Sequence, residues 1–113
     1  MTLEQLKAYG ADVDAALERC MNNESFYFRL IGLAVADPAF EALGAALAAN
    51  DSGKAFEEAH KLKGMIANLS LTPIFTPLSE LTELLRRQTP GDYDGLYREA
   101  LEKKAELVKL LAE

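Results

Sequence analysis

The sequence GKAFEEAHKLKGMIANL, residues 53–69, decides the fold because its apolar residues recur at alternating spacings of four and three. These residues are Ala55, Ala59, Leu62, Ile66 and Leu69. Such spacing places all five on one side of an α-helix, and that side must be buried against other elements. The run NDSG at residues 50–53 is typical of a turn. The stretch therefore predicts an amphipathic helix that begins after a turn and packs inside a helical bundle.

Further helices are predicted on both sides of this stretch. Residues 24–49 form an apolar-rich run that Asp37-Pro38 interrupts, and because proline removes a backbone donor the run is either one kinked helix or two. The next helix covers about residues 73–88. Both Thr72-Pro73 and Thr76-Pro77 could begin it, since each joins a capping residue to a proline. The sequence does not choose between these two starts.

The two ends of the chain complete the predicted set of helices. A last helix is expected at about residues 92–112, and short helices at about residues 2–21, where Thr2 and Gln5 have the spacing of a capping box. Because the predicted connections are short, consecutive helices should pack antiparallel. We expect an all-α fold, an up-and-down antiparallel four-helix bundle with additional short N-terminal helices, and 113 residues suffice for one such domain.

Composition and charge limit the classes of partner. The formal net charge is −6, with 12 Lys and Arg spread among 18 Asp and Glu, so no basic stripe is available for nucleic acid. Cys20 is the only cysteine, and we expect a buried thiol. No signal peptide is recognised, and we expect no apolar stretch to reach the roughly 18 residues of a membrane span. For these reasons we expect a cytoplasmic protein. One bundle accounts for the apolar positions, so we also expect a monomer.

His60 is the one residue with evident chemistry, and it is the only histidine of the chain. At about 100° per residue it lies roughly 130° from the apolar stripe, so the imidazole should face solvent. Gly64 and Ala67 follow on the same face, although a glycine inside a helix costs about 1 kcal/mol relative to alanine. Close approach by another protein is the simplest reason for that glycine. Lys63 is near enough to reach the ring, and Phe56 offers an apolar contact.

Other kinds of site are not expected. One histidine and one cysteine in different helices make no recognisable set of metal ligands. A hydrolase would need a second polar group held against His60, and neither Ser52 nor Cys20 has a spacing that demands it. Acidic residues such as Glu57 and Glu58 are interpreted as a solvated helix face.

The run AHKLKGMIANL, residues 59–69, closely resembles the signature of histidine-containing phosphotransfer (HPt) domains. In that signature, leucine, lysine and glycine occupy the second, third and fourth positions after the phosphorylated histidine. Residues 12–31, with NNESFY at residues 22–27, resemble the lead-in helices of the family. The resemblance covers nearly the whole chain and implies a single HPt domain over residues 1–113. Ser70 departs from it, because the family usually has glycine there, and the departure concerns the end of the helix.

The resemblance implies a phosphorelay. His60 would accept a phosphoryl group, at its Nε2 atom, from an aspartate of a response-regulator receiver domain and pass it to another receiver. A sensor histidine kinase is a second candidate partner. Lys63 would hold the transferred group, Gly64 and Ala67 would leave room for the receiver, and Phe56 would belong to the docking rim.

The resemblance also implies what the chain leaves to its partners. The receiver would bind Mg²⁺, and the chain itself would bind no cofactor and would act as a phosphocarrier without kinase activity. No Walker-type loop, glycine-rich kinase loop or H-R-D run appears in the sequence. The alternative is a helical docking module that binds and regulates a receiver or kinase domain without carrying phosphate. A pure docking surface, however, has no need of a nucleophile.

Overall fold

The computed structural model describes residues 1–113, and its only regular elements are helices. They are α1 (Leu3–Tyr9), α2 (Val13–Arg19), α3 (Glu24–Val35), α4 (Ala39–Ala48), α5 (Ser52–Asn68), α6 (Thr72–Arg86) and α7 (Tyr93–Leu111). The predicted all-α class is therefore confirmed. The bounds of α5, α6 and α7 differ from the predicted ones by one or two residues.

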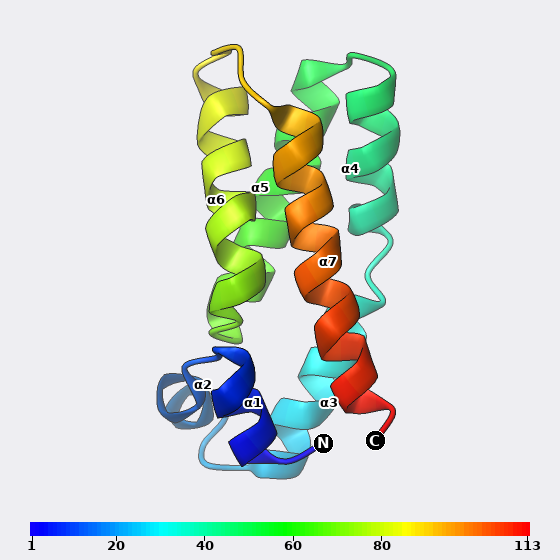
Figure 1. The fold of residues 1–113 in the computed structure, drawn as a ribbon. Coiled ribbons are helices and arrows are strands. Elements are labelled where there is room, and N and C mark those ends of the chain that lie inside the picture. The colour runs from blue at the N-terminus through cyan, green and yellow to red at the C-terminus, as the bar shows by residue number, and fades with distance from the viewer.

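Helices α4, α5, α6 and α7 lie side by side in Figure 1, and the chain direction alternates from each of them to the next. Helix α5 contacts α4 and α6, whereas α7 contacts α6 and α4, so α5 and α7 occupy opposite corners. Helices α1, α2 and α3 gather at one end of this group, where α1 and α3 also contact α7. The arrangement leaves the outer side of α5 free of other helices.

The predicted helix at residues 24–49 is two helices, which resolves the alternative left by Asp37-Pro38. Pro38 is the capping residue of α4, and Asp37 Oδ1 accepts a hydrogen bond at 2.8 Å from the backbone N–H of Ala39, the first residue of that helix. Helix α4 runs beside α5, whereas α3 lies at the end of the molecule that holds α1 and α2.

The apolar run Glu24–Ala48 contradicts the expectation that no apolar stretch is long enough to span a membrane. By length and composition alone it could cross a membrane, since an 18-residue window within it has a mean hydropathy of 1.6. The break divides the run into helices of 12 and 10 residues, each shorter than the roughly 20 residues of a spanning helix. Its large apolar side chains Ile31, Phe40 and Leu43 are buried in the core of the bundle. One third of the 18-residue window is buried in this way, whereas Leu33 and Phe26 of the same run are exposed.

Helix α6 begins at the first of its two candidate starts, but without the predicted threonine cap. Leu71 is the capping residue and makes no side-chain capping bond, while Thr72 is already helical and Pro73 follows in the first turn. Thr76 and Pro77 lie inside the helix, where the Thr76 hydroxyl donates to the carbonyl of Thr72 at 3.1 Å. Pro73 is tolerated because the first N–H groups of a helix have no intrahelical partner, whereas Pro77 lies inside the helix and cannot donate a hydrogen bond to the carbonyl of Pro73.

Ser70 adopts the left-handed conformation for which glycine is usually chosen, with φ of 54°. The backbone N–H of Leu71 donates to the carbonyl of Ile66 at 3.3 Å, which closes the end of α5. Arg19 of α2 donates to Ser70 Oγ at 2.8 Å and to the carbonyl of Asn68 at 3.0 Å. The side chain of Ser70 thereby gains a contact that a glycine would lack, which offsets the strain of the left-handed backbone.

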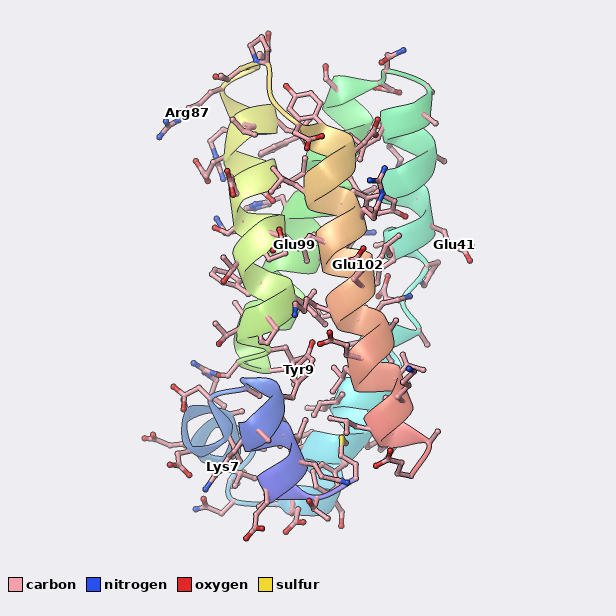
Figure 2. All side chains as sticks on the ribbon, viewed as in Figure 1. Lys7, Tyr9, Glu41, Arg87, Glu99 and Glu102 are labelled. Atoms are coloured by element: carbon pink, nitrogen blue, oxygen red, sulfur yellow. The ribbon has the colours of Figure 1, made fainter.

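Tyrosine hydroxyls fasten the helices to one another. In Figure 2, Tyr9 points from α1 toward α7, where its hydroxyl donates to the carbonyl of Lys103 at 2.7 Å. Tyr97 of α7 donates to the carbonyl of Phe40 at 2.8 Å. Tyr27 of α3 is fully buried and donates to the carbonyl of Leu69 at 2.8 Å, so it satisfies a carbonyl at the end of α5. Cys20 is buried, as predicted.

Replacement of Tyr27 tests the junction between α3 and α5. We expect Tyr27→Phe to lower the free energy of unfolding by about 1–3 kcal/mol, because the Leu69 carbonyl is left unpaired in the core. Urea denaturation followed by circular dichroism measures this loss. Tyr93→Phe is the matched control, since that hydroxyl bonds the Thr89 carbonyl at an exposed site and should matter less. An equal loss in both variants would contradict the importance of the buried bond.

The same tyrosine predicts a loss of stability in alkali. Burial, followed by the charges of Cys20 and Asp12, raises the pKa of Tyr27 from 10.0 to about 12. A group with a raised folded-state pKa stabilises the protein fully below its unfolded pKa, and this contribution disappears as the pH rises toward the folded value. Stability should therefore fall between about pH 10 and pH 12, and less steeply in Tyr27→Phe than in the wild type. Urea midpoints measured across this range provide the test, and equal slopes would contradict it.

Candidate functional site

Helix α5 is held by an apolar stripe that fixes which of its sides meets solvent. Ala55, Ala59, Leu62 and Ile66 are fully buried, and the neighbouring helices α4 and α6 flank them. His60 is exposed on the other side of the helix. The prediction that the imidazole faces solvent is therefore confirmed, and the ring is open to a second protein.

Gly64 leaves open space one turn beyond His60. A Cβ atom built at this position meets no other group of the chain within 4 Å, so the packing of the bundle does not require a glycine. Glycine at a helix interior nevertheless costs about 1 kcal/mol relative to alanine. Ala67, two turns from His60, is half-buried and also small. The packing of the chain therefore does not explain the glycine at position 64.

Phe56 stacks on His60. The two ring centroids are 5.6 Å apart and the ring planes differ by 12°. Phe56 is half-buried and packs against the core, so it limits the orientations that the imidazole can adopt. The guanidinium of Arg86, from α6, lies 5.1 Å from the centroid of the Phe56 ring. Sequence analysis expected Phe56 only as an apolar contact for a partner, so it missed both the stacking of Phe56 on the histidine and the cation that α6 contributes.

Lys63 is engaged by α6 and not by the histidine. Its Nζ lies 3.5 Å from Oε1 of Glu83, and the Nε atom of Arg86 lies 3.3 Å from the same oxygen. Burial raises the pKa of the Glu83 carboxyl, but Arg86 and Lys63 together outweigh burial and leave the pKa below its usual value. In this structure the ammonium of Lys63 is paired with the Glu83 carboxylate, so the role of Lys63 as the charge partner of His60 stays a prediction.

The interpretation of Glu58 as part of a solvated helix face was wrong, because this residue is buried. Its side chain is 7% exposed, and its two carboxylate oxygens lie 3.2 Å from Lys54 Nζ and 3.3 Å from Lys61 Nζ. The hydrogen bond from Lys54 is the largest influence on the pKa of Glu58, and with Lys61 it lowers that pKa against the opposing effect of burial. Glu57 is exposed, as predicted.

The exposed histidine thus stands between two groups of paired charges. Lys54, Glu58 and Lys61 lie within α5, while Lys63 is joined to Glu83 and Arg86 across α5 and α6. The spacing of Glu83 and Arg86 indicates a pair along one helix, but the sequence contains no signal that links them to Lys63. The structure has no group of three or more His, Cys, Asp or Glu side chains arranged to hold a metal ion.

Comparison with known proteins gives one match. Residues 33–112 match the family model described as the Hpt domain, and this range contains α4 to α7 and His60. A search of curated proteins found no match, and a search of solved structures found none either. The family match spans more than half of the chain and includes the helix on which the signature was recognised. The chain belongs to the Hpt domain family, whose members are phosphocarriers that act with receiver domains in two-component phosphorelays.

Proposed function

We propose that this protein is a histidine phosphotransfer protein in which His60 accepts a phosphoryl group from a receiver-domain aspartate, or from a kinase, and passes it to another receiver. The observation that carries the proposal is the exposure of the only histidine beside Gly64, a glycine that the bundle does not need. A nucleophile on an open helix face suits a reaction in which the second reactant is held by another protein.

The reaction needs little from the chain besides the histidine. The lone pair of Nε2 forms the N–P bond while the P–O bond to the donor aspartate breaks, and the electron pair of that bond stays on the aspartate carboxylate. The Nδ1 proton remains on the ring during this step. Return transfer reverses it. We expect the receiver to supply Mg²⁺, so the chain holds no cofactor, while Lys63 provides a positive charge for the transferred group.

The receiver would approach the outer side of α5. Gly64 and Ala67 would accommodate its surface, and Phe56 would contribute to the rim and keep the imidazole oriented. The acidic residues Glu99 and Glu102 lie on α7, at the opposite corner of the bundle (Figure 2). Docking at α5 would thus keep the acidic active site of a receiver away from these carboxylates.

The whole chain would act as one unit. We take α4 to α7 as the antiparallel four-helix bundle of the domain, with α1 to α3 as its N-terminal addition. Leu6, Val13 and Ile31 belong to the same buried core as Leu107, which supports a single domain over residues 1–113. Because this core takes up most of the large apolar side chains, we propose that the protein is a monomer. We also propose the cytoplasm as its location. A dimer seen at micromolar concentration by size exclusion with light scattering would contradict the monomer.

The phosphoacceptor is tested by transfer from a receiver. The purified protein, incubated with Mg²⁺ and a phosphorylated receiver domain from the same organism, should acquire an acid-labile, base-stable label, whereas His60→Gln should acquire none. Circular dichroism checks that both proteins are folded. If folded wild type takes no label from any native receiver or kinase, the docking module that carries no phosphate becomes the better account.

Gly64 is tested by adding one methyl group. Gly64→Ala should raise the free energy of unfolding by about 0.5–1 kcal/mol, because alanine is the better helix former and nothing obstructs its Cβ. The same variant should slow transfer from the receiver by about tenfold or more, because the methyl group displaces the partner from the imidazole.

Gly32→Ala is the matched control for this experiment. Gly32 also lies inside a helix, α3, and a Cβ there also meets nothing within 4 Å. We expect the same stabilisation in urea denaturation and no change in the rate of transfer. Equal transfer rates in the two alanine variants would show that Gly64 has no role in access to His60.

A further inference from the structure

The carboxylate of Glu83 holds two cations with one oxygen atom. Lys63 Nζ lies 3.5 Å and Arg86 Nε 3.3 Å from Glu83 Oε1. The Lys63 side chain is 25% exposed and that of Glu83 39% exposed, so water partly screens the pair. If Lys63 or Arg86 moves away, the Glu83 carboxylate still has the other cation as a partner.

The cluster of Lys63, Glu83 and Arg86 is connected to the proposed phosphoacceptor, His60, in two ways. Lys63 is three residues beyond His60 on α5, a separation at which two helical side chains are neighbours. Arg86 lies over the ring of Phe56, which in turn stacks on His60. A change in charge at the imidazole would therefore act on both cations that Glu83 holds, and Lys63 is the one with a flexible stem on the helix of the histidine.

We propose that Glu83 and Arg86 are positioning residues that control the availability of Lys63. While His60 is free, Glu83 retains the ammonium of Lys63. When His60 carries a phosphoryl group, Lys63 turns to that group and Arg86 keeps Glu83 paired. The inference rests on the proposed phosphotransfer function, and it concerns two residues of α6 that lie outside the signature run on α5.

The two contacts between which Lys63 exchanges differ in strength. A phosphoryl group offers about two negative charges and three acceptor oxygens, whereas Glu83 offers one charge that it shares with Arg86. A partly exposed ion pair changes an equilibrium by only about two- to fivefold. The Lys63–Glu83 pair is therefore strong enough to bias the equilibrium between phosphorylated and free His60, yet weak enough to be exchanged.

The test measures the equilibrium of phosphoryl transfer between the full chain and its receiver. Glu83→Gln releases Lys63 and should shift this equilibrium toward phosphorylated His60 by about two- to fivefold. Arg86→Gln leaves Lys63 as the only close cation of Glu83 and should shift the equilibrium the other way by a similar factor. Opposite shifts from two substitutions one helical turn apart are not expected from a general loss of stability.

Two controls separate this exchange from a simple effect of charge. Glu57→Gln removes the same charge from an exposed residue of α5 that has no ion pair with Lys63, and it should change the equilibrium less. In a Lys63→Gln background, Glu83→Gln should have no further effect, because the residue on which Glu83 acts is gone.

The possible results distinguish the inference from the function on which it rests. If wild type is labelled on His60 but Glu83→Gln and Arg86→Gln leave the equilibrium unchanged, the positioning role is wrong and the phosphotransfer function stands. If the effect of Glu83→Gln persists in the Lys63→Gln background, a direct charge effect replaces the proposed exchange. A folded wild type that takes no label overturns both the function and this inference.

Discussion

The burial of one side of α5 is the constraint on which the rest of the molecule depends. Ala55, Ala59, Leu62 and Ile66 fix the rotation of this helix between α4 and α6, and no other helix covers its outer side. The position of His60 follows from that rotation alone. The end of α5 is held just as firmly, because Tyr27 bonds the carbonyl of Leu69 and Arg19 bonds Ser70. A rigid helix can therefore present a reactive ring without a surrounding pocket.

The electrostatics of the site follow from the neighbours of α5. Two carboxylates, Glu58 and Glu83, bind four cations around the histidine and leave each of these groups with a net positive charge. Such groups can stabilise added negative charge at His60 while the chain as a whole stays acidic, with a net charge of −6. The proposed partner is a receiver domain with an acidic active site. The positive groups around His60 would attract that acidic site toward the histidine.

The features that could be predicted from the sequence depend on a single helix. The apolar spacing of α5 was enough to place His60 and Gly64 on the exposed side. The features that could not be predicted depend on how two helices meet: the pairing of Lys63 with Glu83 requires the register of α6 against α5, and the burial of Glu58 requires knowledge of what covers α5. The break at Asp37-Pro38 was recognised, but only packing decided between a kink and two helices.

The most direct test of the central claim is nuclear magnetic resonance of the ¹⁵N-labelled protein after phosphorylation by its receiver. Because the chain has one histidine, a phosphorus signal coupled to an imidazole nitrogen can arise only from His60. The account predicts coupling to Nε2 and loss of the signal in acid. Bound phosphorus without coupling to an imidazole nitrogen, or no bound phosphorus while the amide spectrum reports a folded bundle, would contradict it.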